Sequence, residues 1–293
     1  MDGHFATIAQ LALNGVSIGS IYALVALGLV LTYKATEVLN FAHGDLVMCA
    51  AFFAWGLITI GVPFWITFVV VVALVALLAY MLEARVMRLI IGQPQFAGVM
   101  LTIGLAFMLR GAVSMAFGPE SRSYATPFSG GITKIGPAVI ADLNLVIIAV
   151  VLTVTVALSV FFRASRVGVA IQAASQNQLA AYLCGIRVKR LNSLVWALAG
   201  GFAAVAGLLL APITLVDVSL WFVVLKAMAA LVLGGFGSVP GAIVGGLAIG
   251  LIEQFAGVYA ADGVKDIAAY VVLIAVLVFY PRGLLGEAHG RRV

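Results

Sequence analysis

The stretch LVMCAAFFAWGLITIGVPFWITFVVVVALVALLAYML (46–82) contains no charged residue. The hydrocarbon core of a bilayer is about 30 Å thick, and roughly 20 apolar residues in helical form cross it. The stretch is long enough for two crossings, and Pro63 lies near its middle, where a proline favours a turn between helices. We therefore expect a hairpin of two membrane-spanning helices here.

The remainder of the chain has the same apolar character. Of 293 residues, 64% are hydrophobic and only 9% are charged, and the mean hydropathy is +1.21. Soluble globular domains carry about 25% charged residues. We expect an all-α, polytopic transmembrane helical bundle that forms a single transmembrane domain over residues 1–293. The N-terminal segment lacks a basic region, so it is interpreted as a permanent span rather than a cleaved signal peptide.

About eight or nine spans are expected. They are placed near 8–32, 46–61, 64–82, 96–117, 143–162, 191–211, 219–235, 241–260 and 265–281. The segments 34–45 and 234–241 could instead be re-entrant, which would shift boundaries without changing sidedness.

The connecting segments predict the orientation of the chain. The segment 163–190 holds five basic residues and no acidic one, so the positive-inside rule places it in the cytoplasm. Arg85 and Arg88, together with the tail residues Arg282, Arg291 and Arg292, fall on the same side. The Gly-, Pro- and Ser-rich segment 118–142 is then an external loop, the N-terminus is outside and the C-terminus is cytoplasmic.

A weak internal repeat relates two parts of the chain. Residues 16–56 consist of an apolar helix, the break NFAHGD and a helix of small residues, and residues 219–250 follow the same order around GGFGSVPG. Breaks in corresponding places point to a transport pathway. Chance similarity between glycine-rich segments is the competing explanation.

The stretch QAASQNQLAAYLCGIR (172–187) is unusually polar for this chain. Ser175 and Gln178 form an S-x-x-Q capping box, and Gly185 lies where a glycine ends a helix. A single apolar stripe would contain Leu179, Tyr182, Leu183 and Ile186. The helix has about ten residues, or roughly 15 Å, which is too short to span a bilayer.

This short cytoplasmic helix could rest on lipid or dock against a partner protein. Helices at the lipid surface usually carry Lys and Arg on their polar face. The polar face here carries the amides Gln172, Gln176, Asn177 and Gln178. Uncharged amides beside small alanines favour a protein groove, so docking to a soluble partner is the preferred interpretation.

The break NFAHGD contains Asn40, His43 and Asp45. It could expose backbone groups and helix ends to a polar solute beside a central pathway. The alternative is structural, with Asp45 as the N-cap of the second span and Asn40 closing the first.

Three charged residues, Arg110, Lys226 and Glu253, lie within or near predicted spans, where a buried charge costs on the order of 3 kcal/mol. Arg110 and Lys226 lie close enough to the external ends to extend toward water. Glu253 could also pair with Lys226.

Glycines four residues apart suggest close helix packing, within the chain or against a second subunit. They are Gly15 and Gly19, Gly237, Gly241 and Gly245, and Gly246 and Gly250.

Several function classes lack their sequence signals. The chain has no G-x-x-x-x-G-K-[ST] pattern and no catalytic motif, so ATP hydrolysis would require separate subunits. The three His residues show no metal-ligand spacing, which predicts no metal site. No basic, aromatic-rich soluble face suggests nucleic acid.

Four segments resemble one known family. They are LNGVSIGSIYALVALGLVLTY (13–33), VLNFAHGDLVM (38–48), QAASQNQLAAYLCGI (172–186) and GGFGSVPGAIVGG (234–246). Together they resemble the permease subunit of branched-chain amino acid ABC importers of the LivH type.

The resemblance implies a subunit of the bacterial inner membrane that binds no cofactor itself. It implies a second related permease, two cytoplasmic ATPases that hold ATP and Mg²⁺, and an extracytoplasmic solute-binding protein. Coupling to the ATPases would involve Ser175, Gln176, Asn177, Gln178, Leu179, Ala181, Tyr182 and Gly185. Candidate pathway residues are Asn14, Gly19, Tyr22, Asn40, Phe41, His43, Gly44, Gly235 and Gly237.

The coupling segment departs from the family pattern. Family members commonly carry acidic residues where this chain has Gln176 and Asn177, and a basic residue where it has Gln172. Docking is therefore expected to use shape and amide hydrogen bonds.

The solute is not determined by the sequence. Leucine, isoleucine or valine is expected, with urea, short amides or other amino acids as alternatives. An ion-coupled secondary transporter is a further alternative, but it needs paired ionisable groups at membrane depth, and few are evident.

Overall fold

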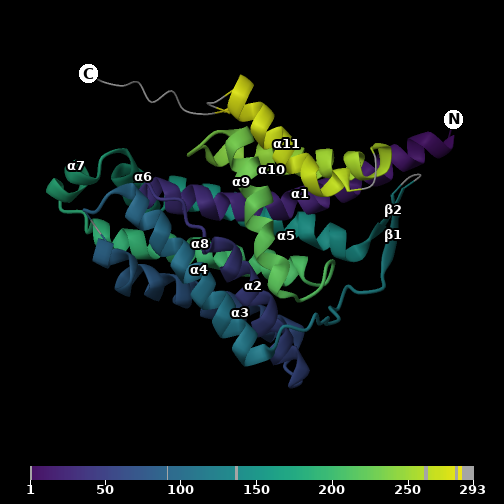
Figure 1. The fold of residues 1–293 in the computed structure, drawn as a ribbon, viewed down its shortest axis with the longest axis horizontal. Coiled ribbons are helices and arrows are strands. Elements are labelled where there is room, and N and C mark those ends of the chain that lie inside the picture. The colour runs from purple at the N-terminus through teal and green to yellow at the C-terminus, as the bar shows by residue number, and fades with distance from the viewer. Residues whose placement is uncertain (1, 91, 136–137, 261–262, 281–282, 286–293) are drawn as a thin grey trace. The chain divides into compact units, whose positions relative to one another are not determined.

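The computed structural model describes residues 2–90, 92–135, 138–260, 263–280 and 283–285, and helices make up most of this part of the chain (Figure 1). The tail residues Arg282, Arg291 and Arg292 lie outside it. The long helices are α1 (Asp2–Thr36), α2 (His43–Thr59), α3 (Phe64–Arg85), α4 (Gln95–Phe117), α5 (Asp142–Ala164), α8 (Val188–Leu210), α10 (Val239–Tyr259) and α11 (Val264–Phe279). The shorter elements are the 3-10 helices η1 (Met87–Ile90) and η2 (Val218–Phe222), and α6 (Arg166–Gln176), α7 (Gln178–Leu183) and α9 (Val223–Gly234).

Every predicted span corresponds to a helix or a pair of consecutive helices. Six helices in the described part of the chain are long and apolar enough to cross a membrane. The spans predicted at 46–61, 219–235 and 265–281 correspond to shorter apolar helices, at His43–Thr59, Val218–Gly234 and Ile267–Phe279. The polytopic helical class is therefore confirmed, while the number of crossings and the internal repeat stay predictions.

Prolines mark the starts of two of these helices. Pro63 is the residue before α3, with φ −56° and ψ 143°, and Pro94 precedes α4 with nearly the same angles. Proline fixes φ near these values and disfavours helical geometry in the residue before it. The predicted turn at Pro63 between α2 and α3 is confirmed.

The connection 118–142 contains regular structure that the sequence analysis missed. Strands β1 (Ile132–Ile135) and β2 (Ala138–Ala141) pair antiparallel, with Ile132 opposite Ala141. The Thr133 hydroxyl donates to Asp142 Oδ1 at 2.7 Å, which fixes the hairpin to the start of α5. Strands of four residues within a Gly- and Pro-rich segment are too short to show a clear alternating pattern.

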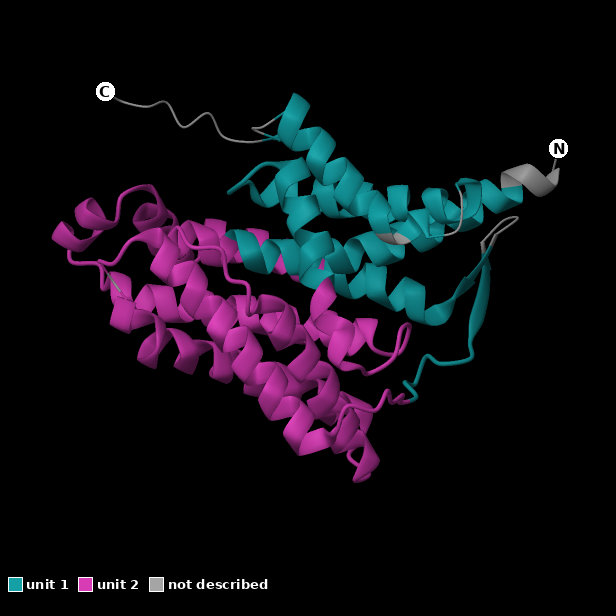
Figure 2. Cartoon of the chain, viewed as in Figure 1, with its two compact units in different colours: residues 1–30, 125–152, 223–293 teal, residues 31–124, 153–222 magenta. Residues whose placement is uncertain are grey.

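Contacts divide the chain into two compact units (Figure 2). Unit 1 comprises residues 1–30, 125–152 and 223–293, and unit 2 comprises residues 31–124 and 153–222. Each unit contains residues from distant parts of the sequence, as expected for a helical bundle with antiparallel neighbours.

Unit 1 is held together by the glycine pairs that the sequence singled out. A Cβ on Gly250 would stand 2.3 Å from the Gly19 Cα, and one on Gly246 would stand 2.4 Å from the Ala23 Cα. A Cβ on Gly245 would stand 2.0 Å from the Ala230 carbonyl oxygen. Backbone therefore lies directly on backbone between α1 and α10 and between α9 and α10, and the predicted close packing occurs within the chain.

Unit 2 is organised around α8. A Cβ on Gly207 would stand 2.3 Å from the Val47 carbonyl oxygen of α2, and one on Gly200 would stand 2.5 Å from the Ala79 Cβ of α3. The Trp196 side chain, 1% exposed, is among the largest buried groups. These contacts pack the middle and the end of α8 against α2 and α3.

Candidate functional site

The polar segment 165–187 forms two short helices rather than one. The Ser165 hydroxyl accepts a hydrogen bond from the Gly168 N–H at 2.8 Å and caps α6. At Asn177 the backbone becomes extended, with φ −156° and ψ 103°, and α7 begins at the next residue. Asn177 Oδ1 accepts from the Ala180 N–H at 2.9 Å, so Asn177 is the N-cap of α7.

The capping box predicted from Ser175 and Gln178 is wrong. Ser175 lies inside α6, and its hydroxyl donates to the Gln172 carbonyl at 2.8 Å. The Gln178 side chain instead donates to the Ala35 carbonyl at the end of α1, at 2.9 Å. Asn177 is a better cap because its amide oxygen reaches the N–H three residues ahead at the residue where the helix begins. The predicted ten-residue helix is correspondingly shortened to six residues.

The end of this helix agrees with the prediction. Gly185 has a φ of +84°, which disfavours residues with a Cβ, and its N–H donates to the Tyr182 carbonyl. The Ile186 N–H donates to the Ala181 carbonyl at 3.1 Å. This is the glycine-terminated ending expected of a short helix.

Three apolar side chains of α7 point away from the protein. Leu179 is 69% exposed, Tyr182 67% and Leu183 77%, while Ala181 on the opposite face is buried. Three members of the predicted stripe thus face outward, while the fourth, Ile186, lies past the end of α7 and is half-buried. Gln176 and Asn177 are also exposed, and both are uncharged.

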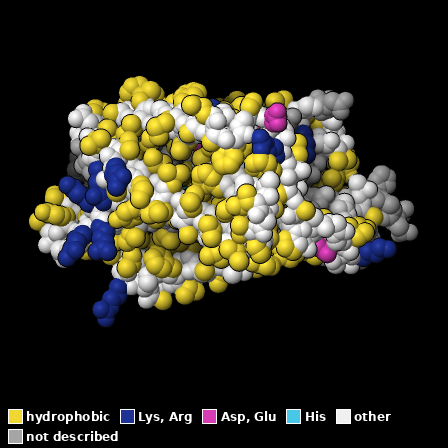
Figure 3. All heavy atoms as spheres, turned by 90° about the horizontal axis from the view of Figure 1, so that it is seen from below, with side chains coloured by type: hydrophobic (Ala, Val, Ile, Leu, Met, Phe, Trp, Pro, Cys, Tyr) yellow, Lys and Arg dark blue, Asp and Glu magenta, His cyan; other side chains and the backbone are white. Residues whose placement is uncertain are grey.

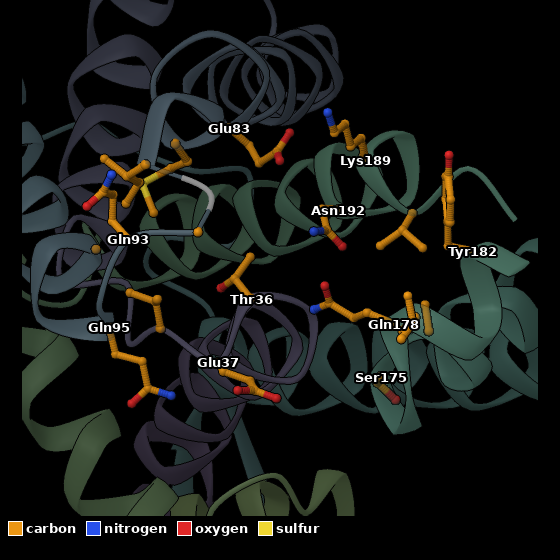
Figure 4. Close-up of a pocket in the computed structure, with 18 of the residues that line it drawn as sticks. Thr36, Glu37, Glu83, Gln93, Gln95, Ser175, Gln178, Tyr182, Lys189 and Asn192 are labelled. Carbon is orange, nitrogen blue, oxygen red and sulfur yellow. The ribbon is translucent and has the colours of Figure 1, made fainter.

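Beside α7 lies a cavity of about 1000 Å³ within unit 2 (Figure 4). It is bounded by the end of α1, the end of α3 with η1, the start of α4, the α6–α7 segment and the start of α8. Figure 4 shows Thr36, Gln178 and Asn192 pointing into it. The Gln178–Ala35 hydrogen bond ties the start of α7 to the end of α1 beside this cavity.

A buried polar cluster lies at the edge of this cavity. Glu83 is 2% exposed and accepts a hydrogen bond from the Ser193 hydroxyl. Arg88 lies 3.5 Å from the Glu83 carboxylate and donates to Ser193 Oγ at 2.7 Å and to the Lys189 carbonyl at 3.1 Å. The cluster links α3 and η1 to the first turn and a half of α8.

The break NFAHGD is a buried turn. Asn40 Oδ1 accepts from the Ala42 N–H at 3.1 Å, and the Phe41 N–H donates to Thr102 Oγ1 of α4 at 3.3 Å. His43 and Gly44 are buried in the first turn of α2. These contacts show that the break is anchored to α4, and that Asn40 shapes the turn before α2 rather than ending α1, which stops at Thr36.

The N-cap role predicted for Asp45 is wrong. The N-cap position is Ala42, without a side-chain hydrogen bond. Asp45 is fully buried, and its carboxylate accepts two hydrogen bonds from Arg110, at 3.0 and 3.3 Å. The Arg110 guanidinium also lies over the Trp221 ring, 3.9 Å from its centroid.

The predicted extension of Arg110 toward water is wrong for the same reason. A two-pronged contact with a carboxylate and stacking on an indole hold the guanidinium inside the protein. Arg110 could not be assigned to Asp45 from the sequence, because the two residues lie 65 positions apart.

The hypothesis that Lys226 pairs with Glu253 is confirmed. Lys226 Nζ lies 2.6 Å from Glu253 Oε1, and the Tyr22 hydroxyl donates to Glu253 Oε2 at 2.6 Å. Glu253 is 3% exposed. This cluster joins α1, α9 and α10 within unit 1, and it brings in the predicted pathway residue Tyr22.

The remaining predicted pathway residues of unit 1 have mainly packing contacts. Asn14 accepts from the Asn144 side chain of α5 at 3.3 Å, and Gly19 packs on α10. Gly235 and Gly237 have φ of +105° and +83° and form the turn between α9 and α10. The carbonyls of Leu233 and Gly234, just before this turn, accept from the N–H groups of residues 284 and 285, at 2.8 and 2.9 Å.

Basic side chains gather at the end of the molecule where Figure 1 labels α6 and α7 (Figure 3). Those of unit 2 that are exposed and lie in or next to this segment are Arg85, Arg163, Arg166, Arg187, Lys189 and Arg190. Next to these basic side chains, most of the surface in this view is hydrophobic. The apolar side chains on this face suit contact with lipid, and the basic side chains of unit 2 suit contact with water.

Comparison with known proteins gives a consistent result. A family described as "Branched-chain amino acid transport system / permease component" matches residues 11–280. The chain is 30% identical to the high-affinity branched-chain amino acid transport system permease protein LivH of Escherichia coli (strain K12), over the full length of both. It is 30% identical to the permease protein BraD of Pseudomonas aeruginosa, over 97% of each chain.

A more distant similarity reaches the archaea. The chain is 26% identical to a probable branched-chain amino acid transport permease protein LivH of Methanocaldococcus jannaschii, over 94% of this chain and 92% of that one. No solved structure matches the chain. On the extent of the family match and the full-length similarity to LivH, the chain belongs to the permease family of branched-chain amino acid transport systems.

Proposed function

We propose that this chain is the permease subunit of an ABC importer and forms part of the pathway for branched-chain amino acids. The observation that carries the proposal is the family match over residues 11–280, together with full-length relatives named as branched-chain amino acid permeases. The six long apolar helices of the described chain agree with this role, since a permease must cross the bilayer repeatedly.

The basic end that carries α6 and α7 faces the cytoplasm in this proposal. Its exposed arginines and lysine follow the positive-inside rule, which sets sidedness from Lys and Arg in short loops. The protein then lies in the bacterial inner membrane, with its N-terminus outside and its C-terminus in the cytoplasm.

Helix α7 is the docking element for a cytoplasmic ATPase. Three features support this assignment: Leu179, Tyr182 and Leu183 are exposed, the helix is too short to span a membrane, and its base is tied to the end of α1 through Gln178. An apolar helix face that inserts into a partner groove is a common mode of recognition. Movement of the ATPase would reach α1 through the Gln178–Ala35 contact.

The complete transporter would contain a second related permease, two ATPases that bind ATP and Mg²⁺, and a solute-binding protein on the outer side. The binding protein would supply most of the solute discrimination. Branched-chain amino acids are the proposed solutes, because the related permeases are named for their transport.

Transport into sealed vesicles tests the proposal. Vesicles that contain this chain and its co-expressed partner subunits, loaded with ATP and supplied with binding protein, should accumulate labelled leucine. A Walker-lysine variant of the ATPase should abolish this uptake. Uptake by this chain alone under an ion gradient, independent of ATP, would instead identify a secondary transporter.

A further inference from the structure

An apolar groove separate from the coupling cavity lies on unit 2. Its volume is about 590 Å³, and it is bounded by α3, α5, α6 and α8. Its lining consists of apolar side chains and one glycine, including Val167 and Ile171 from α6 and Leu194, Ala197, Gly201 and Val205 from α8. Among the described residues no polar side chain lines it, so a solute with hydrogen-bonding groups would lose hydration there without compensation.

The length of the groove matches a lipid chain in one leaflet. Leu194 and Val205 are eleven residues apart on α8, which corresponds to roughly 16 Å at 1.5 Å per residue. This is about half of the 30 Å hydrocarbon core. The groove therefore has the length of one acyl chain.

Helix α6 borders this groove beside α5. A Cβ on Gly168 would stand 2.4 Å from the Phe161 carbonyl oxygen, so the first turn of α6 lies directly on the last turns of α5. The Ser165 cap fixes the same corner. Val167 and Ile171 then face the groove from a helix whose position is determined by backbone contact.

Two exposed cations lie close in the chain to residues that line the groove, although neither is itself part of the lining. Arg190 precedes Leu194 by four residues on α8, so both lie on the same stripe of the helix. Arg166 adjoins Val167 at the start of α6. Neither arginine forms an ion pair with a described residue, in contrast to Arg88 and Arg110.

We propose that this groove binds an anionic phospholipid, with one acyl chain along α8 and the phosphate between Arg166 and Arg190. The apolar lining selects a hydrocarbon chain, and the two cations, without a neighbouring carboxylate among the described residues that line the groove, select a negative headgroup. The inference requires only that the chain lies in a membrane, so it does not depend on which solute is transported.

Native mass spectrometry of the full-length chain, with its co-purifying subunits in mild detergent, tests the proposal. Dioleoyl phosphatidylglycerol should bind more tightly than dioleoyl phosphatidylcholine. Replacing Arg166 and Arg190 with Gln should weaken phosphatidylglycerol binding about fivefold for each arginine and leave phosphatidylcholine binding unchanged. Both side chains are exposed, so these substitutions remove charge with little loss of packing.

A second variant tests the apolar part of the site. A Cβ on Gly201 would have only Val72 Cγ1 nearby, at 3.9 Å, so Gly201→Leu has room to fill the groove. It should abolish tight binding of both lipids. Gly104→Leu is the matched control, because a Cβ there meets nothing within 4 Å and the residue lies outside the groove, and Lys189→Gln is the control for charge because Lys189 lines the other cavity.

The outcomes are distinguishable. An unchanged phosphatidylglycerol preference in the arginine double variant would overturn the proposal, and so would unchanged lipid binding in Gly201→Leu. So would crosslinking of a Gly201→Cys variant to a neighbouring subunit in the membrane, because a protein would then cover the groove.

Discussion

Glu253 has both carboxylate oxygens engaged: Lys226 contacts one and the Tyr22 hydroxyl donates to the other, each at 2.6 Å. Asp45 is likewise fully engaged by Arg110. An uncompensated charge within a membrane-spanning segment is costly, and pairing removes most of that cost. Glu253 in unit 1 and Asp45 in unit 2 are thus each accompanied by a specific cation.

The Lys226–Glu253 pair predicts a compensating double substitution. Lys226→Met leaves a buried carboxylate without its cation, and Glu253→Gln leaves the lysine without its anion, so each single variant should lose about 3 kcal/mol or more of unfolding free energy. The double variant should recover most of this loss, because the amide oxygen introduced at position 253 can still accept from the Tyr22 hydroxyl. Thermal unfolding in detergent measures the loss of stability in each variant. Additive losses in the double variant would contradict the pairing.

Asp217 predicts a pH dependence outside the membrane segments. The hydrogen bond from the Ser121 hydroxyl, followed by that from the Ser219 N–H, lowers the pKa of the Asp217 carboxyl. Since the folded pKa lies below the unfolded one, the carboxylate contributes stability above about pH 4, and that contribution is lost as the pH falls through the folded pKa.

Asp217→Asn should accordingly lower the Tm at neutral pH and make little difference at the acidic end of the accessible range. Measuring the Tm difference between wild type and variant from about pH 7 to about pH 3 checks this. Ser121→Ala should show the same convergence, and a difference that widens on acidification would contradict the assignment.

At the scale of elements, the α1–α10 contact depends on glycine. A Cβ at Gly250 would stand 2.3 Å from the Gly19 Cα, and helix backbone cannot move aside as a side chain can. Gly250→Ala should therefore destabilise the protein by about 1–3 kcal/mol through overpacking. Gly104→Ala, where a Cβ meets nothing within 4 Å, should be neutral or slightly stabilising. Equal Tm values for the two variants would contradict the backbone contact.

The cap of α7 gives a second prediction at this scale. Asn177→Ala removes the hydrogen bond to the Ala180 N–H and should lower the stability of α7 by about 1 kcal/mol. Ser175→Ala should have little effect, because its hydroxyl bonds within α6. Hydrogen exchange at residues 178–183 reports the difference, and faster exchange in Ser175→Ala than in Asn177→Ala would restore the capping-box interpretation.

These elements show which features a sequence pattern can predict. Charge-free runs and Pro63 located the helices, since helix length and proline geometry depend on neighbours in the chain. Gly15, Gly19, Gly246 and Gly250 indicated close packing through their four-residue spacing. Ser175 and Asn177 are both residues that could cap the short helix. The S-x-x-Q pattern favoured Ser175, whereas Asn177 is the cap in the structure. The partner of Arg110 and the outward direction of Leu179 and Tyr182 depend on tertiary packing, so no local pattern could reveal them.

At the scale of the whole molecule, the chain combines apolar helices with a basic segment around α6 and α7, in which α7 is a short, exposed helix. Leu179 and Tyr182 are about two-thirds exposed on a helix that is too short to span a bilayer. Around them the helix offers amides instead of acids. A partner that covers α7 would gain apolar burial and hydrogen bonds, with little contribution from ion pairs made by the helix itself.

The most direct test of α7 as the docking helix is ATP-driven leucine uptake by variants of α7 in reconstituted vesicles. ATP hydrolysis is recorded in the same vesicles. Leu179→Ala with Tyr182→Ala should reduce uptake at least about tenfold and weaken co-purification of the ATPase, whereas Gln176→Ala should retain most of both. Uptake by the wild type should also change little between low and moderate salt. Strong loss in Gln176→Ala with normal coupling in the Leu179 and Tyr182 variant would contradict the assignment of α7 as the docking helix.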